Sequence, residues 1–175
     1  MSHRLSSIAA ALLLALSPVV LGACGFKPVY GTAGQQGPVG AALANVQIDP
    51  IVDRNGQILR NNLIDRFYTD GRPSDPRYRL AVSLSAMEEE LGIQKDATAT
   101  RARLRLQASY ELIDTHNGQV VYRTFSRSVI SFNLLDSQFA VLASRQDAYD
   151  RGLTELADDI RTRLSLYFAR EQQQP

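Results

Sequence analysis

The stretch from Arg101 to Leu112 constrains the fold of this chain most, because apolar and polar residues alternate along it without a break. The polar set is Arg101, Arg103, Arg105, Gln107, Ser109 and Glu111, and the apolar set between them is Ala102, Leu104, Leu106, Ala108, Tyr110 and Leu112. A period of two places alternate side chains on opposite faces of a β-strand. One face of this strand must therefore be buried, while the other carries arginines toward solvent.

The rest of the chain supplies three more strands and two one-sided helices. The expected elements are a strand at 46–48, a helix at 57–68 after a turn at 53–56, strands at 78–86, 101–112 and 120–132, and a long helix that begins at Asp136 or Ser137 and frays at 171–175. Each helix repeats its apolar residues every three or four positions, so each has one face to bury. We predict an α+β fold, a two-layer sandwich of two helices on an antiparallel-rich sheet, in the order β-α-β-β-β-α.

The turn between the last two strands decides which side chains share a face. A three-residue loop with Gly118 in the left-handed region pairs Thr115 with Gln119, and therefore Glu111 with Arg123. In that register one face, here called the arginine face, carries Arg101, Arg103, Arg105, Arg123 and Arg127. A two-residue loop would shift the register by one residue and separate the two groups of arginines. We favour the three-residue loop because it sets Glu111 opposite Arg123.

The first 24 residues have the pattern of an exported lipoprotein. Arg4 precedes an apolar run from Ile8 to Leu21, which is typical of a secretory signal peptide and is shorter than the roughly 20 residues that cross a bilayer. The segment Leu21-Gly22-Ala23-Cys24 resembles a bacterial lipobox, in which the thiol is acylated and the chain is cut before the cysteine. Cys24 is the only cysteine, and an unpaired cysteine in an exported protein needs a special role. The alternative is an ordinary signal peptide followed by a stray cysteine.

These signals divide the chain into four parts. We expect a lipoprotein signal peptide at 1–23, a lipidated tether at 24–43, the α+β domain at 44–171 and a disordered tail at 172–175. Glycine and proline in the tether are typical of linkers. Two or more acyl chains on Cys24 would anchor the protein stably, and we expect no cofactor besides this covalent N-acyl diacylglycerol. Gly25 rather than Asp after the cysteine resembles the sorting signal for the outer membrane.

Composition and motifs argue against catalysis and against nucleic-acid binding. The 19 Lys and Arg residues nearly balance the 18 Asp and Glu residues, whereas nucleic-acid-binding domains usually carry a net basic field. The chain has no serine-hydrolase motif, no phosphate-cradling glycine loop and no His/Cys cluster for zinc. We interpret His116 as a turn residue, Glu88–Glu90 as a solvated strand end, and Asp158 and Asp159 as helix residues that point in different directions. We therefore expect no enzyme and no metal site.

Arginine dominates the basic residues, because Lys27 and Lys95 are the only lysines. Its planar guanidinium is suited to binding phosphate or carboxylate groups. A GC-rich genome would produce the same bias, and composition alone does not choose between the two explanations.

Three segments together resemble the LptE family of lipopolysaccharide-assembly lipoproteins, in its alphaproteobacterial form. They are the opening Cys24-Gly-Phe-Lys-Pro-Val-Tyr-Gly31, the stretch 46–63 and the stretch 146–164. The resemblance implies two helices packed on a four-stranded mixed sheet, which agrees with the element order above. It also implies a lipid-anchored protein on the periplasmic side of the outer membrane. There it would plug the barrel protein LptD and bind lipopolysaccharide during its assembly into the outer leaflet.

The resemblance assigns lipopolysaccharide binding to basic residues near the turn between the second and third strands and on the fourth strand. Lys95, or Gln94 if the match shifts by one residue, fits the first position, and Arg127 fits the second. Hydrogen bonds from arginine to phosphate are among the stronger polar contacts, so the predicted lipopolysaccharide site is Lys95, Arg101, Arg103, Arg105, Arg123 and Arg127. The alternative is a lipid-anchored periplasmic adaptor whose arginine face is only solvated or faces a partner.

Overall fold

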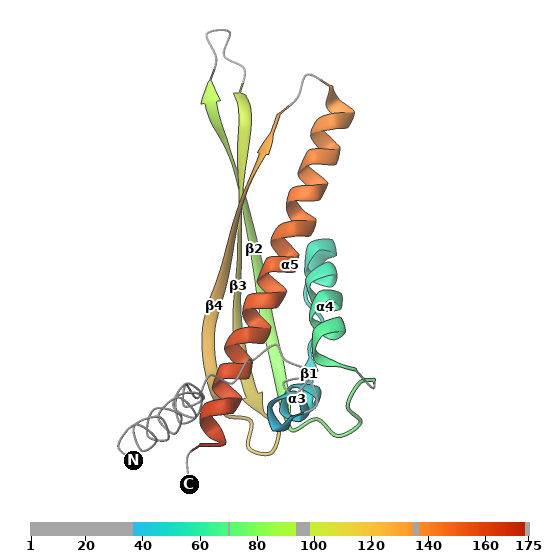
Figure 1. Ribbon diagram of the computed structural model, residues 1–175, viewed down its shortest axis with the longest axis vertical. Helices are drawn as coiled ribbons and strands as arrows, with labels where there is room; N and C mark the ends of the chain where they lie inside the picture. Colours follow the sequence, from blue (N-terminus) through green and yellow to red (C-terminus); the bar gives the residue numbers. More distant parts are fainter. Residues whose placement is uncertain (1–36, 70, 94–98, 135–136, 174–175) are drawn as a thin grey trace, which may run out of the picture.

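The computed structural model of the chain describes residues 37–69, 71–93, 99–134 and 137–173. The elements in this part of the chain are α3 (Pro38–Ala44), β1 (Val46–Ile48), α4 (Asp53–Phe67), β2 (Tyr78–Ile93), β3 (Ala99–Asp114), β4 (Val120–Asn133) and α5 (Gln138–Glu171). Figure 1 shows two layers, with the sheet in one and the helices α4 and α5 in the other. The predicted α+β class and the order β-α-β-β-β-α are confirmed, and α3 precedes them as an additional helix.

The sheet has the strand order β1-β2-β3-β4. β1 pairs with β2 in parallel, whereas β2, β3 and β4 pair antiparallel, so the sheet is mixed. The three long strands extend well beyond β1 and α4, and α5 runs beside them for most of their length (Figure 1). Although α5 has 34 residues, no helix within the described ranges is both long and apolar enough to cross a membrane.

The strand β2 is longer than the predicted strand at 78–86, because Glu88 to Glu90 continue it instead of ending it. The Glu88 carboxylate lies 3.0 Å from the Arg145 guanidinium on α5. The Glu89 carboxylate lies 2.9 Å from the Arg105 guanidinium on β3. Successive side chains of a strand point to opposite faces, and here each of these two carboxylates meets an arginine. The strand therefore does not end at these residues as predicted, although all three glutamates remain exposed.

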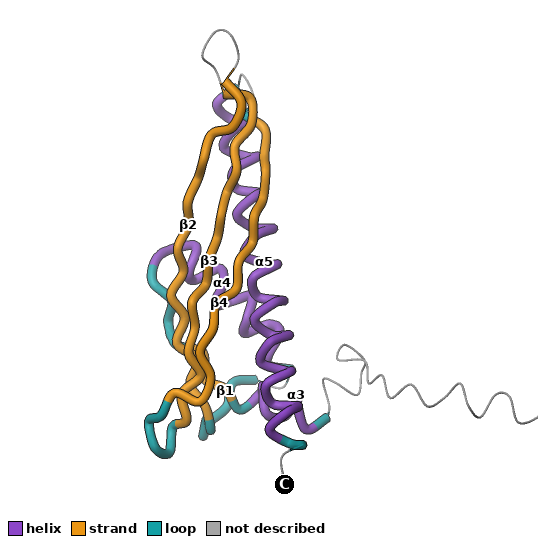
Figure 2. The backbone as a smooth tube through the Cα atoms, turned by 90° about the vertical axis from the view of Figure 1, so that its left-hand side faces the viewer, coloured by secondary structure: helices purple, strands orange, loops and turns teal. Residues whose placement is uncertain are grey.

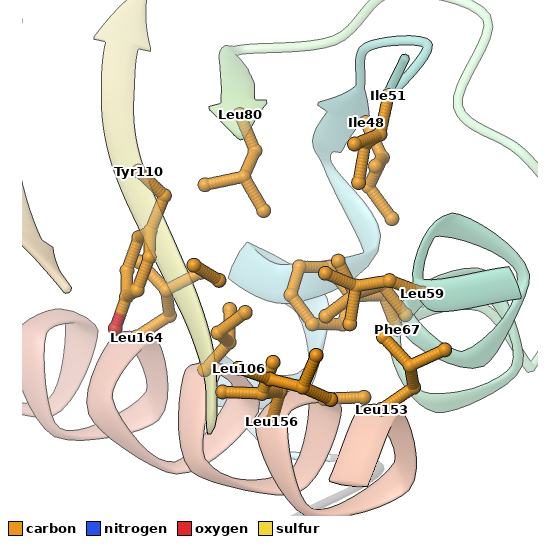
Figure 3. Packing of buried hydrophobic residues seen from close by; sticks show 14 of the residues in the cluster. Ile48, Ile51, Leu59, Phe67, Leu80, Leu106, Tyr110, Leu153, Leu156 and Leu164 are labelled. Carbon is orange, nitrogen blue, oxygen red and sulfur yellow. The ribbon is translucent and has the colours of Figure 1, made fainter. Parts of the chain in front are cut away.

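The core lies between the inner face of the sheet and the apolar faces of α4 and α5. Figure 3 shows Leu106 and Tyr110 of β3 in one cluster with Leu59 of α4 and Leu156 of α5. These four side chains are at most 1% exposed. Burial of one such leucine contributes about 1.5–3 kcal/mol, and no disulfide is possible in a chain with one cysteine. The packing of this cluster therefore holds the two layers together.

The N-terminal part of the domain differs from the predicted linker and turn. Leu43 of α3 is only 2% exposed and belongs to the core, so this helix packs onto the domain. The predicted turn at 53–56 is the first turn of α4. Asp53 has a positive φ of 67°, which short polar residues tolerate better than others do, and its Oδ1 accepts a hydrogen bond from the Gly56 N–H (2.8 Å). This contact satisfies one of the free N–H groups at the start of the helix.

Candidate functional site

The hairpin of β3 and β4 places the five arginines of the arginine face on the side of the sheet away from the helices. Glu111 lies opposite Arg123, and Gln107 lies opposite Arg127, so the predicted register is confirmed along most of the hairpin. Burial alternates along β3, where Leu104 and its even-numbered neighbours are buried and the arginines are exposed or half-buried. Figure 2 looks onto the sheet, and none of the labelled helices crosses in front of the strands: the lower part of α5 lies beside them and its upper part behind them. The arginine face is therefore open within the described part of the chain.

The turn that sets this register differs from the predicted three-residue loop. Asp114 donates its N–H to the Gln119 carbonyl (2.9 Å), so the loop has four residues, 115–118, and Thr115 does not pair with Gln119. Gly118 does adopt a left-handed conformation, with φ of 71°. The pairing then shifts by one residue next to the turn, which leaves Val121 as an extra residue in β4. This bulge compensates for the longer loop and restores the predicted register.

Carboxylates on neighbouring strands neutralise part of the arginine face. Glu89 of β2 lies 2.9 Å from Arg105 and 3.9 Å from Arg103. Glu111 lies 2.8 Å from Arg123. The remaining two, Arg101 and Arg127, have no ion pair among the described residues, and Arg127 lies over the Phe125 ring at 5.8 Å from its centroid. The five arginines thus outnumber the two carboxylates that pair with them, and the face keeps a positive surplus.

Apolar side chains stand among these arginines. Met87 is 63% exposed, Phe125 48% and Val129 50%. Met87 and Val129 both lie opposite Arg105, one on each side of it in the sheet. Exposed apolar groups of this size beside cations favour an amphipathic anionic ligand or a partner protein over a small polar solute. The predicted site lacks these three residues. Phe125 and Val129 share the face in the predicted register but carry no charge, whereas the place of Met87 depends on the register of β2 against β3, which neither strand reveals alone.

Two open hollows adjoin the arginine face. The larger, of about 430 Å³, lies between the C-terminal end of β4 and α5, and its lining includes Arg101, Ser131, Asn133, Asp147 and Arg151. The smaller, of about 340 Å³, lies over the other end of the outer face, and its lining includes Ala81, Ser83, Ser109, Glu111 and Arg123. Their linings are mostly polar side chains and small residues.

Two predicted site residues, Cys24 and Lys95, lie outside the described residues, as does Gln94. The lipid anchor and the basic turn residue therefore have no structural description. The other predicted residues, Arg101, Arg103, Arg105, Arg123 and Arg127, share one face as expected.

The residues that we excluded from a catalytic role have structural partners. His116 lies in the turn, and its backbone N–H donates to Asp114 Oδ1 (2.8 Å). This hydrogen bond is the main cause that lowers the pKa of the Asp114 carboxyl, and Arg77 lowers it further. Asp158 pairs with Arg66 (2.6 Å), whereas Asp159 pairs with Arg163 (2.7 Å), so the adjacent carboxylates point to different partners. Among the described side chains, no three His, Cys, Asp or Glu residues gather to hold a metal ion.

Structures of bacterial lipoproteins share this fold. A candidate lipoprotein from Caulobacter crescentus CB15 is 26% identical, covers 77% of this chain and 98% of its own, and has a TM-score of 0.61. A minor lipoprotein from Acinetobacter baumannii is 16% identical, covers 70% of this chain and 89% of its own, and has a TM-score of 0.52. Lipoprotein B from Nitrosomonas europaea is 14% identical, covers 71% of this chain and 83% of its own, and has a TM-score of 0.54. At these identities the last two support the fold alone.

Family comparison adds the functional context. No curated protein matches the chain significantly. The family model described as "LptE: Lipopolysaccharide-assembly" matches residues 43–164, which span the domain from the end of α3 to the last turns of α5. This chain belongs to the LptE family, whose role is lipopolysaccharide assembly.

Proposed function

We propose that this protein sits inside the outer-membrane barrel LptD as a supporting plug, and that its arginine face binds lipopolysaccharide during assembly into the outer leaflet. The observation that carries the proposal is the arginine face itself, in a chain of the LptE family. Five outward arginines there stand against two pairing carboxylates, Glu89 and Glu111. Membership of the family supports LptD as the partner.

The chemistry of the face suits the phosphorylated, acylated end of lipopolysaccharide. Arg101 and Arg127 have no ion pair among the residues that the structure describes, so their guanidinium groups are open to phosphate oxygens. Arg103 and Arg105 share Glu89, and an exposed ion pair of this kind contributes only about 0–1 kcal/mol. A phosphate group can therefore displace Glu89 at small cost. Met87 and Val129, beside Arg105, offer apolar contacts to acyl chains.

The proposed mode of action is binding without catalysis. The chain enters the domain at α3, at the same end of the molecule as the C-terminal end of α5 (Figure 1). An acyl anchor on Cys24 would hold this end at the periplasmic side of the outer membrane. We keep Lys95 in the proposed lipopolysaccharide site, since it follows β2, whose outer-face residues belong to the arginine face.

A charge-reversal experiment tests lipopolysaccharide binding. The triple variant Arg103→Glu, Arg105→Glu and Arg127→Glu should lose at least about tenfold in affinity for purified lipopolysaccharide, because attraction to phosphate becomes repulsion. The matched control reverses three exposed arginines away from the face: Arg54, Arg72 and Arg170. Both variants change the net charge equally, and circular dichroism checks that both fold. Equal binding by the two variants in a pull-down would refute the site.

Copurification tests the barrel partner separately. Tagged protein extracted from membranes should bring down LptD, and photo-crosslinkers at exposed domain positions should give adducts with it. Recovery of an inner-membrane complex instead would favour the adaptor function over the plug.

A further inference from the structure

β4 ends the sheet, and its outer edge has no neighbouring strand among the described residues. The strand has 14 residues and contains neither proline nor lysine. Along an edge strand, every second residue points its backbone N–H and C=O groups away from the sheet, where they can pair with another strand. The bulge at Val121 disturbs only the end next to the turn. A long, regular stretch of β4, residues 123–131, thus remains available for pairing.

The opposite edge of the sheet is better protected. β1 pairs with the first residues of β2, from Tyr78 to Leu80. Farther along, β2 carries three consecutive acidic residues, Glu88–Glu90, and charges on an edge strand discourage the approach of another strand. β4 carries its two charges, Arg123 and Arg127, only on the outer face, where they alternate with Phe125 and Val129, each about half exposed at 48% and 50%. The two edges therefore differ in their capacity for strand addition.

α5 packs over β4, and an open hollow lies between the two elements near the C-terminal end of the strand. α5 packs on the inner face of the sheet, where Leu156 and Leu164 join the core (Figure 3). Near the C-terminal end of β4, the hollow of about 430 Å³ is lined from the sheet by Ser131 and Asn133 and from α5 by Asp147 and Arg151. A strand beside β4 would run past this hollow, which could receive one of its side chains.

We propose that the edge of β4, from 123 to 131, receives an extended segment of a partner protein as a fifth strand of the sheet. This inference goes beyond the proposed function, because it concerns the edge of the sheet and needs no lipopolysaccharide. Directly paired residues of neighbouring strands bring their Cβ atoms to about 4.5–5.5 Å, so the partner's outward side chains would contact those of Phe125, Arg127 and Val129.

Charge and polarity on β4 define the chemistry of this segment. Arg123 already pairs with Glu111 (2.8 Å), whereas Arg127 has no carboxylate partner among the described residues. The segment therefore carries an acidic residue opposite Arg127 and apolar residues opposite Phe125 and Val129. Its inward residues, next to the buried Ser126 and Ser128, are small or hydroxylated.

A peptide whose sequence reads the same in both directions can probe the site. It presents the same side chains whether it pairs parallel or antiparallel to β4, and the test does not require the natural partner. The fluorescein-labelled peptide Thr-Val-Thr-Glu-Thr-Val-Thr is titrated with the full lipidated chain in detergent at low ionic strength, and binding is read by fluorescence anisotropy. It should bind about fivefold more tightly than the same peptide with Lys in place of Glu, as expected for one exposed cross-strand charge pair. The Arg127→Glu variant should reverse this preference.

Backbone methylation distinguishes strand addition from simple contact with the face. Two further peptides are N-methylated. One carries the methyl groups on the two valines and the glutamate, whose side chains point outward, and the other carries them on the threonines. One set of amides points at β4 and the other points away, so one methylated peptide should lose binding and the other should keep it. Equal binding of both methylated peptides would overturn the proposal, as would an unchanged charge preference in Arg127→Glu.

Two lysine variants locate the binding site. Val129→Lys places a charge on β4 and should abolish peptide binding, whereas Met87→Lys, which lies opposite Arg105 on β2, should leave it unchanged. If Met87→Lys abolishes binding and Val129→Lys does not, the β4 edge is not the site. If instead excess unlabelled protein displaces the peptide and sedimentation shows a dimer, the edge serves a second copy of this chain, and the partner proposal fails.

Discussion

Gly152 of α5 packs directly against Leu106 of β3. A Cβ atom at position 152 would lie 2.7 Å from Leu106 Cδ1 and 3.4 Å from Ser128 Oγ. Since Leu106 is fully buried, its side chain has little space to move aside. The missing side chain therefore sets how closely α5 approaches the sheet.

We predict that Gly152→Ala lowers the free energy of unfolding by about 1 kcal/mol. Alanine gains up to about 1 kcal/mol of helix propensity, but overpacking of a core costs about 1–3 kcal/mol. Urea denaturation measures the difference. In a double-mutant cycle with Leu106→Ala, the loss should be less than additive, because the second change removes the clashing atom. A stabilised Gly152→Ala protein would show that α5 can shift away from the sheet.

We predict that Glu89→Gln raises the affinity for lipopolysaccharide by about threefold, because exposed ion pairs of this kind are worth up to about 1 kcal/mol. The change frees Arg105 and Arg103 from their shared carboxylate. Glu90→Gln is the matched control, since Glu90 is also exposed and lies next in β2 but points to the other face of the strand. Binding to immobilised lipopolysaccharide is compared at low and high salt. An equal increase in both variants would indicate a general charge effect and not a site on the arginine face.

We predict that the stability of the fold decreases between about pH 10 and 12. Burial raises the pKa of Tyr110 to about 12 from its ordinary value of 10.0, although the hydrogen bond with Ser126 opposes the shift. In this range the unfolded chain loses the phenol proton before the folded protein does, so rising pH favours unfolding. Chemical denaturation at several pH values should show that the free energy of unfolding falls less steeply with pH in Tyr110→Phe than in the wild-type protein. An equal decline in both proteins would mean that other groups cause it.

We predict that Cys24→Ser releases the protein from the membrane fraction in cells that lack LptD, where the barrel cannot retain it. Without the thiol there is no site for the acyl chains, and no helix within the described ranges could span the membrane in their place. Fractionation followed by mass spectrometry of the N-terminus measures the effect, and wild-type protein should begin at an acylated Cys24. Gly25→Ser is a suitable control because it leaves the thiol in place. Membrane retention of Cys24→Ser in cells that lack LptD would contradict the anchor.

Local patterns account for much of the fold that could be predicted. The alternation around Leu104 and Leu106 predicted a strand with one buried face, and both side chains are 0% exposed. The register that unites the arginine face was also correct, but the turn was not. A three-residue loop and a four-residue loop followed by a bulge give the same register. The structure has the four-residue loop, which Asp114 stabilises through hydrogen bonds with Gln119 and His116. These hydrogen bonds depend on the geometry of the folded turn.

Other features escaped prediction because they depend on contacts between distant segments. Pro38 and Gly40 are typical of a linker, yet α3 forms there and Leu43 enters the core. The acidic run in β2 continues the strand in its pairing with β3, and Arg145 and Arg105, from α5 and β3, meet its carboxylates.

The order of residues was enough to establish the class of the fold, the buried faces and the arginine face, since periods of 2 and 3.6 residues specify which side of an element must leave water. Tertiary packing decided the close approach of α5 at Gly152, the pairing of Glu89 with Arg105 and the open edge at β4. These features arise from the positions of segments that lie far apart in the chain, and a local pattern carries no information about which segment comes to lie beside it.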